Sequence, residues 1–401
     1  MNKYTPQKNR VQIFRASLRN SASTLCLSVF LLLFIAACQP EPEVEPTLQM
    51  RQFANGLLNP AGMAELPYVT ILVAEEGTGK NDFSAGVSMI TPDGEVGRLI
   101  SGLPSGRDSG DLSGVPFVKL SPDGRTLYTA HFNLGHLYTL PVSNASSLPA
   151  EPFTTDDLGS QMMPLNNVQL TNPFDMTFDP NGVPVVSDAS GNGVAKETED
   201  GTTRFIHRFA SIKIENGSID PVPTGIERIG REYFVTLFGG CPYPAGSGRL
   251  VAIDENRNER IVTDGLNMPI DVARGPDGTI WLLEFAEFRP DASCFSGMGY
   301  QANSGRLSRV FANGSTELVM EGLNFPTSVL PRADGSLLIS QVFEGNIIEL
   351  YWGQPEPESL MLPDVAAAVS PTRHAFSDLD AVLRKVIEQE GLRPFPGQDI
   401  P

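Results

Sequence analysis

Five acidic residues and one histidine recur at matching places in this 401-residue sequence, and they are its best candidates for chemistry. Asp175 and Asp271 each lie two positions after a proline that opens an apolar segment. The other four each end a short run of β-forming residues: Glu75, His131, Asp188 and Glu284. Carboxylate oxygens hold hard cations such as Ca²⁺, and a histidine would extend the set toward a transition metal. Without a cation, clustered carboxylates repel one another, and raised pKa values would suit them to acid or base chemistry.

These positions also have a purely structural interpretation. An acidic residue at the end of a strand can accept hydrogen bonds from loop backbone, and this alternative stays open for Asp188 and Glu284. Asp175 and Asp271 are the stronger functional candidates, because the matching positions elsewhere hold small or neutral residues. Those residues are Gly62, Val118, Gly225 and Ser328.

The element that positions these residues is a repeat. A proline opens a short apolar run six times, at intervals of 46 to 57 residues: Pro60, Pro116, Pro173, Pro223, Pro269 and Pro326. Each time a turn, a second β-rich run, a loop with glycine and two further runs follow. Several of the turns are Pro-Asp-Gly, as at 122–124 and 276–278, where glycine supplies the positive φ. Four short strands per repeat and six repeats predict an all-β, six-bladed propeller.

The sequence also predicts how the ring closes. Only three runs follow Pro326, and the missing fourth precedes the first repeat, since residues 49–57 resemble residues 317–323. An N-terminal strand should therefore complete the last blade and remove an exposed sheet edge, with the propeller spanning 48–353. In such a blade the first strand begins, and the second ends, on the same face. The candidate side chains should therefore converge on one mouth of the central channel.

Three long loops are expected on the face that holds this mouth, at 76–86, 239–247 and 286–304. They would give the mouth an aromatic and partly cationic rim: Lys80, Tyr243, Phe288, Arg289 and Tyr300. Such a rim suits a flat organic or sugar-like ligand, although loops that merely cover the mouth would look similar.

Cys241 and Cys294 fall in equivalent loops of neighbouring repeats. Outside the cytoplasm this arrangement favours a disulfide over a metal site or two free thiols.

The N-terminal sequence indicates export. Residues 1–37 carry five basic and no acidic residues and end in an apolar run too short to span a membrane comfortably, which is typical of a signal peptide. Residues 35–38, Ile-Ala-Ala-Cys, resemble a bacterial lipobox with Cys38 as the lipidated residue. The alternative is a plain secretory signal with a chance cysteine. The Pro/Glu-rich stretch 38–47 would then serve as an extended linker.

Charge restricts the partners. The full chain has a net charge of −18, and removal of 1–37 would bring it to about −23, which repels nucleic acid and anionic lipid headgroups. We therefore expect an extracytoplasmic monomer that touches a bacterial membrane only through its lipid and that binds a small molecule or an extracytoplasmic protein. Residues 354–401 read as a tail with one amphipathic helix near 378–390.

Several phrases resemble the ScyD/ScyE family of exported propellers, over residues 49–352. They are 56–62 (Gly-Leu-Leu-Asn-Pro-Ala-Gly), 72–79 (Leu-Val-Ala-Glu-Glu-Gly-Thr-Gly), 87–94 (Val-Ser-Met-Ile-Thr-Pro-Asp-Gly) and 305–310 (Gly-Arg-Leu-Ser-Arg-Val). The resemblance implies export and kinship with NHL, gluconolactonase-like and sorbosone-dehydrogenase-like propellers, but it supplies no catalytic motif. Gluconolactonase-like enzymes hold a divalent metal with an acidic residue in the first inner strand. Here that stretch is Asn59–Met63, without an acid.

Two hypotheses follow from the sequence. The first is a cell-envelope lipoprotein that binds a small ligand or a partner at its acidic channel mouth. The alternative is a metal-dependent hydrolase or oxidoreductase acting on a lactone, sugar or aromatic metabolite. In that case Asp175 and Asp271 would hold a divalent cation such as Ca²⁺, and Glu75 or His131 would act as base.

Overall fold

The computed structural model describes residues 46–353, with gaps at 109, 132–136, 162–169, 171, 199–201 and 295–298. The predicted signal peptide, Cys38, all but the end of the linker, and the tail with its helix near 378–390 lie outside the described residues. Within them, no helix has the length and apolar character needed to cross a membrane.

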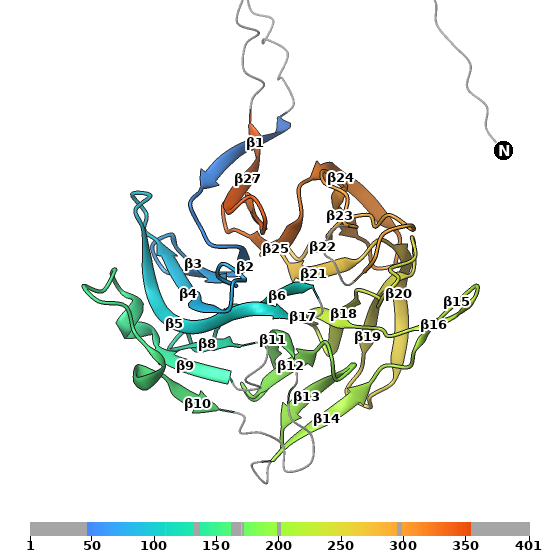
Figure 1. The fold of residues 1–401 in the computed structure, drawn as a ribbon, viewed down its shortest axis with the longest axis horizontal. Helices are drawn as coiled ribbons and strands as arrows, with labels where there is room; N and C mark the ends of the chain where they lie inside the picture. The colour runs from blue at the N-terminus through green and yellow to red at the C-terminus, as the bar shows by residue number, and fades with distance from the viewer. Residues whose placement is uncertain are drawn as a thin grey trace, which may run out of the picture. The chain divides into compact units, whose positions relative to one another are not determined.

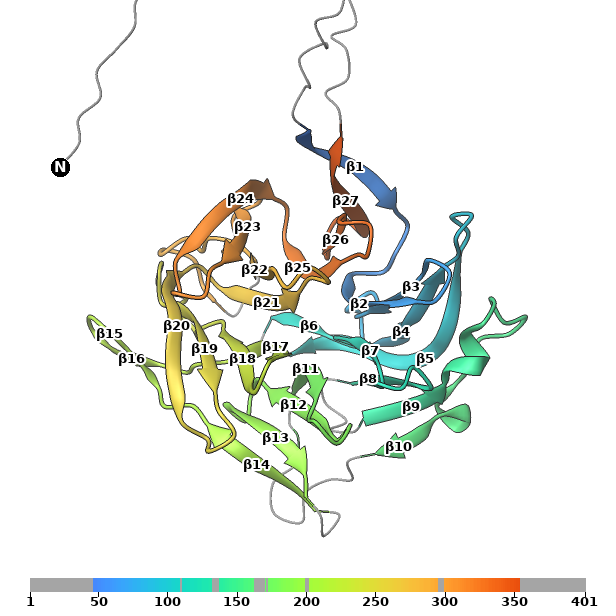
Figure 2. The same cartoon turned by 180° about the vertical axis from the view of Figure 1, so that it is seen from behind.

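The described chain is a six-bladed β-propeller, as the repeat predicted (Figures 1 and 2). Blade 1 consists of β2 (Pro60–Leu66), β3 (Thr70–Glu75), β4 (Asp82–Ile90), β5 (Val96–Asp108) and the additional β6 (Asp111–Ser113). Blade 2 consists of β7 (Val118–Leu120), β8 (Thr126–Ala130), β9 (Leu137–Pro141) and β10 (Gly159–Gln161). Blade 3 consists of β11 (Pro173–Phe178), β12 (Pro184–Asp188), β13 (Gly193–Glu197) and β14 (Thr203–Arg208).

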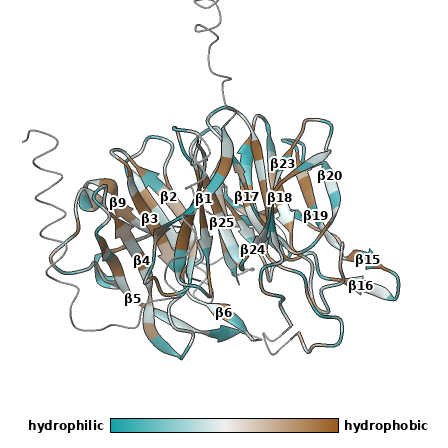
Figure 3. Ribbon diagram, turned by 90° about the horizontal axis from the view of Figure 1, so that it is seen from above, coloured by the Kyte–Doolittle hydropathy of each residue, from teal (hydrophilic) through white to brown (hydrophobic). Residues whose placement is uncertain are grey.

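Blade 4 consists of β17 (Pro223–Ile229), β18 (Glu232–Leu237), β19 (Gly248–Ile253) and β20 (Glu259–Leu266). Blade 5 consists of β21 (Pro269–Arg274), β22 (Ile280–Glu284), β23 (Gly305–Val310) and β24 (Thr316–Leu323). Blade 6 consists of β25 (Pro326–Pro331), β26 (Leu337–Gln341), β27 (Asn346–Gly353) and β1 (Thr47–Ala54). Between blades 3 and 4, β15 (Ile212–Ile214) and β16 (Gly217–Ile219) form a hairpin that projects from the ring (Figure 3). Two short 3-10 helices, η1 (Val142–Ala145) and η2 (Thr155–Asp157), lie near the outer edge of blade 2.

The repeat prolines mark the inner strands. Five of the six are the first residue of an inner strand, and Pro116 precedes β7 by two residues. Proline suits this position because the first residue of a strand need not donate to the ladder. We call the face where inner strands begin and second strands end the mouth.

The N-terminal strand closes the ring, as predicted. β1 pairs antiparallel with β27, from Thr47 opposite Gly353 to Ala54 opposite Ile347. Because β27 starts at the mouth, where Asn346 pairs with Gln341, Thr47 lies at the opposite face of the ring. The last blade therefore combines the two ends of the propeller, and β1 covers the outer side of β27.

A buried arginine joins blade 6 to blade 1 at this closure. The Arg332 guanidinium lies 3.2 Å from Glu65 Oε1 of β2 and 3.3 Å from Glu349 Oε1 of β27. Glu349 also pairs with Arg51 of β1, whose side chain is 63% exposed, whereas the Arg332 side chain is 9% exposed. Two arginines in different solvent environments thus share one buried carboxylate.

Replacing each arginine in turn tests how much the buried and the exposed ion pairs contribute to stability. Arg332→Met should lower the free energy of unfolding by about 3 kcal/mol, because it leaves the buried Glu349 with only the exposed Arg51 and leaves Glu65 without a cation. Arg51→Met should cost less than about 1 kcal/mol, as expected for an exposed ion pair. Urea unfolding of both variants measures the difference, and equal losses would show that the buried pairs are not what fastens the closure.

Candidate functional site

A cavity of about 440 Å³ opens at the mouth of the channel. Its floor is formed by the residues that directly follow four of the repeat prolines: Phe174, Thr224, Ile270 and Thr327. This is the place where the strand pattern predicted side chains to converge. The residues that line its walls come mostly from loops and from β6.

One wall of the cavity is aromatic. Phe238, Tyr243, Phe285, Tyr300 and Phe343 line it, and their rings pack against one another, with centroids 5.2 Å apart for Phe285 and Tyr300 and 5.9 Å apart for Tyr243 and Tyr300. Such edge and tilted contacts fix the rings in place and present flat apolar faces to the cavity.

The predicted rim residues take different places around this wall. Tyr243 and Tyr300 line the cavity, and Phe288 packs behind them, with ring centroids 5.0 Å and 5.3 Å from theirs. Lys80 and Arg289 are exposed and are not among the described lining residues. The cavity is therefore lined by two of the three predicted aromatic residues, while its described lining contains no Lys or Arg side chain.

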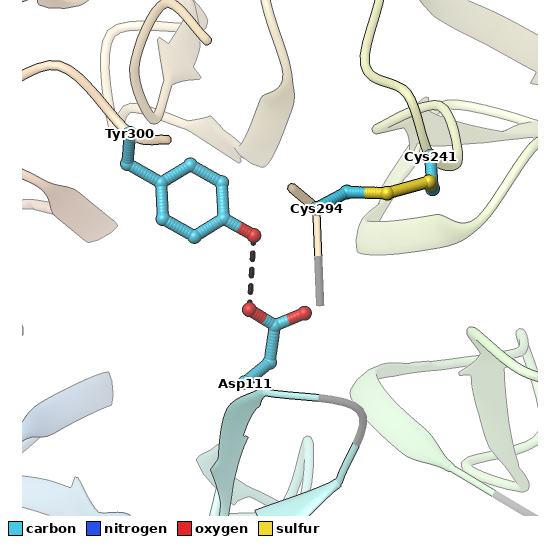
Figure 4. The surroundings of a disulfide bond; sticks show 4 residues. All are labelled: Asp111, Cys241, Cys294 and Tyr300. Atoms are coloured by element: carbon cyan, nitrogen blue, oxygen red, sulfur yellow. Dashed lines mark hydrogen bonds between the residues drawn. A yellow bond between two sulfur atoms is a disulfide. The ribbon is translucent and has the colours of Figure 1, made fainter. Parts of the chain in front are cut away.

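The sequence reading missed the β5–β6 hairpin, which reaches across the mouth. β5 has 13 residues, and β6 lies at the centre of the ring in both face views (Figures 1 and 2). The Tyr300 hydroxyl donates to Asp111 Oδ1 at 2.9 Å, which joins the hairpin of blade 1 to a loop of blade 5 (Figure 4). Leu112 packs into the apolar cluster that contains Ile270 and Phe285. The hairpin thus forms one side of the cavity.

Four carboxylates face the cavity together with the rings: Glu76, Asp108, Asp111 and Asp220. Glu76 is only 9% exposed, and no described residue donates a hydrogen bond to its carboxylate. Burial raises the pKa of Glu76 to about 8, the nearby Asp111 adds to the shift, and Arg107 opposes it. Burial also raises the pKa of Asp111, although the Tyr300 hydroxyl works against it. At neutral pH the Glu76 side chain is therefore mostly a neutral acid.

The acidic residues at the ends of second strands make hydrogen bonds within their own blades. Glu75 accepts from the Leu58 N–H at 2.5 Å, Asp188 from Asn172 at 3.1 Å and Glu284 from Asn267 at 2.6 Å. Glu75 also pairs with Arg98 at 3.1 Å. In each case the donor lies just before a repeat proline, so these carboxylates hold the loop that leads into the inner strand.

His131 lies apart from these carboxylates. It is 3% exposed, and its Nε2–H donates to the Pro104 carbonyl of β5 at 2.7 Å. Burial lowers its pKa, although the Pro104 carbonyl acts in the other direction. Neither His131 nor Glu75, Asp188 or Glu284 lines the cavity. The structure therefore does not bring the six predicted residues together at one point.

Asp175 and Asp271 lie below the cavity floor, in a channel with about 20 Å³ of free space. Each carboxylate bonds the next blade: Asp175 Oδ2 accepts from Ile226 N at 3.1 Å, and Asp271 Oδ2 accepts from Val329 N at 2.9 Å. A lysine that the sequence did not single out pairs with the first of them, with Lys119 Nζ 3.0 Å from Asp175 Oδ1. Lys119 is three positions after Pro116, whereas the repeat draws attention to the second position.

This arrangement does not suit a divalent cation. One Asp175 oxygen accepts from Ile226 N, and the other lies 3.0 Å from the Lys119 ammonium, which supplies the positive charge that a metal would bring. Among the described residues no group of three or more His, Cys, Asp and Glu is placed to hold a metal ion. Burial still raises the pKa of Asp175, with Lys119 opposing, and it raises the pKa of the neighbouring Glu227 to about 7. The channel is thus a compact cluster of buried charges.

The predicted disulfide between Cys241 and Cys294 is present, with Cα atoms 5.8 Å apart. It joins the mouth loops of blades 4 and 5. Cys241 lines the cavity, and in Figure 4 the Cys294 end of the bond is the one nearer Tyr300 and Asp111. The bond therefore fixes the loops that hold the aromatic wall.

No protein-family model and no curated protein sequence matches this chain. Solved structures do. A gluconolactonase from Xanthomonas campestris is 10% identical with a TM-score of 0.54, over 77% of this chain and 91% of that one. A Bacteroides thetaiotaomicron protein of unknown function is 10% identical with a TM-score of 0.52, over 76% of each chain. Virginiamycin B lyase from Staphylococcus aureus is 16% identical with a TM-score of 0.43, over 78% of this chain and 90% of that one. At these identities the likeness shows the fold alone.

Glu76 should make stability depend on pH. Between pH 4.5 and about 8 the folded protein keeps a proton on Glu76 that the unfolded chain releases, so stability falls as pH rises, by up to about 1.4 kcal/mol per pH unit. Glu76→Gln should remove this part of the slope in urea unfolding from pH 5 to pH 9. The exposed Glu321→Gln is the control and should keep it. An unchanged slope in Glu76→Gln would contradict the assignment.

Removing the channel cation should also give a pH-dependent loss. Lys119→Met leaves Asp175 without its ion pair, so stability should fall by about 3 kcal/mol at pH 8. The loss should be smaller at pH 5, where the carboxyl takes up a proton. The double variant Lys119→Met/Asp175→Asn should recover part of the loss at pH 8. Equal losses at both pH values would instead indicate lost packing.

Proposed function

We propose that this protein is an exported, lipid-anchored propeller of the ScyD/ScyE type that binds a small organic ligand in the cavity at its mouth. The observation that carries the proposal is the cavity itself. Its volume of about 440 Å³ falls within the range of roughly 300 to 1,000 Å³ typical of ligand pockets. An aromatic wall and a few polar groups at fixed positions are the usual means of holding a flat ligand in one orientation.

The contacts within the mouth favour a prepared site over an accidental hollow. Ring packing, the Tyr300 bond to Asp111 and the Cys241–Cys294 disulfide fix walls that come from blades 1, 4 and 5. A ligand would meet side chains already held in place, so little ordering would oppose binding.

The position of the first strand fits attachment to a membrane. Thr47 begins β1 at the face opposite the mouth. A lipid on Cys38 would therefore attach to the chain that enters the ring at the face opposite the mouth. This supports an envelope protein that binds a small molecule.

The channel favours binding over metal-assisted catalysis. Asp175 and Asp271, the candidates for holding a cation, already bond Ile226, Val329 and Lys119. The gluconolactonase among the similar structures shares the fold at 10% identity, which does not extend its activity to this chain.

A variant that fills the cavity tests the proposal. Ser190 lines the cavity and is exposed, so Ser190→Trp should occupy ligand space without disturbing the core. Ser218→Trp on the β15–β16 hairpin is the matched control. With the full chain in detergent and 2-(hydroxymethyl)naphthalene as probe, calorimetry should show binding to wild type and to Ser218→Trp. Binding to Ser190→Trp should be weaker by about tenfold or more. Equal binding by all three proteins, or none by wild type, would overturn the proposal.

A further inference from the structure

We infer that the cavity at the mouth is a site for an organic cation, an ammonium group carried on an aromatic or other flat apolar body. The inference rests on the proposed ligand-binding function and names the class of ligand. It comes from the combination of groups in the cavity, which includes four carboxylates, an aromatic wall and, among the described lining residues, no cationic side chain.

Among the described residues, no Lys or Arg side chain forms an ion pair or hydrogen bond with the carboxyl group of Glu76 or Asp111. Asp111 accepts from a neutral hydroxyl, Tyr300, and Glu76 receives no hydrogen bond from any described residue. The nearest cation is Arg107, which is exposed and donates to the Gly110 carbonyl at 2.8 Å. The internal sequence gaps contain no Lys or Arg either. A buried carboxyl side chain aimed into such a space is stabilised by a ligand that brings donors and positive charge.

The aromatic wall reinforces this preference. Ring faces carry negative electrostatic potential, so a cation held above Tyr243, Phe285 or Tyr300 is attracted in addition to the contact with carboxylates. Tyrosine and phenylalanine faces on one side and carboxylates on the other are the combination that recognises ammonium groups with an apolar body. An anionic ligand of the same shape would meet repulsion from both sides.

Glu76 should couple cation binding to proton release. It is mostly protonated at pH 7, since its pKa is about 8. The charged groups that face it are Asp111 of β6 and Arg107 and Asp108 of β5, and the Glu75–Arg98 pair lies beside it. An ammonium group arriving in the cavity lowers the pKa of Glu76. The cation therefore takes the place of the proton, and up to one proton leaves for each ligand bound.

Three probes with the same ring test the inference on the full chain: naphthalen-2-ylmethylammonium, 2-(hydroxymethyl)naphthalene and 2-naphthoate. At pH 7 the ammonium should bind about tenfold or more tightly than the alcohol, and the carboxylate should bind most weakly. Calorimetry in buffers of different ionisation enthalpy should show proton release with the ammonium and none with the alcohol.

Two variants separate a local contact from the general negative charge of the chain. In Glu76→Gln the proton release should disappear, and the ratio of ammonium to alcohol affinity should fall. Asp264→Asn removes an exposed carboxylate from β20, outside the cavity, and should leave both unchanged.

The outcomes distinguish failure of the preference for a cation from failure of ligand binding at the mouth. If ammonium and alcohol bind equally well and Ser190→Trp weakens both, the mouth binds ligands and the preference for a cation is wrong. An ammonium preference that Asp264→Asn lowers as much as Glu76→Gln would also overturn it, because general attraction would then explain it. If no probe binds, the inference and the proposed function fail together.

Discussion

At its first residues, each inner strand of the propeller is not fully paired within its own blade. The hydrogen-bonding groups of its backbone must therefore find partners in the next blade. Pairing with the second strand shifts register directly after the repeat proline, as between Pro173 and Asp175 and between Pro269 and Asp271. The backbone groups freed there face the channel, where an unpaired N–H or C=O would be costly. Hydrogen bonds between neighbouring blades around the channel satisfy them.

These bonds explain the residues found two positions after four of the six prolines. In blade 1 the Gly62 N–H donates to the Pro116 carbonyl at 2.9 Å, and a Cβ at Gly62 would lie 2.7 Å from Phe117 Cα. In blade 4 a Cβ at Gly225 would lie 2.6 Å from Asp271 Cα. Where adjacent strands come so close, only glycine fits. In blades 3 and 5 an aspartate holds this position, and its carboxylate accepts from an N–H of the next blade, at Ile226 and at Val329. The chemical asymmetry of the repeat thus accompanies a difference in how each blade bonds its neighbour.

The fold could be predicted from the sequence because the signals for it repeat. A proline at the start of the inner strand and a glycine turn before the second strand recur in several repeats. A signal that recurs in this way does not arise by coincidence. The closing strand resembles the fourth strands, so its place was also readable. The disulfide followed because Cys241 and Cys294 occupy equivalent loops of neighbouring repeats.

The cavity could not be predicted in the same way, because its walls are what the repeats do not share. β6 has three residues and no pattern of its own, and only its crossing of the mouth brings Asp111 to Tyr300. The repeat singles out Glu75 as the end of a strand, whereas Glu76, one residue later, faces the cavity. Consecutive residues of an extended chain point to opposite sides, and the sequence alone does not show where the strand gives way to the loop.

The two sets of buried acids differ in what neutralises them. The carboxylates of the channel receive backbone N–H groups from the next blade and the Lys119 ammonium, so their desolvation is offset within the protein. Glu76 is as thoroughly removed from water, yet in the described chain its main compensation is a retained proton. The proton on Glu76 can be lost again, because a bound group with positive charge can replace it. The charges that hold the ring together and the charges available to a ligand are therefore separated by a single layer of side chains, the floor formed by Phe174, Ile270 and Thr327.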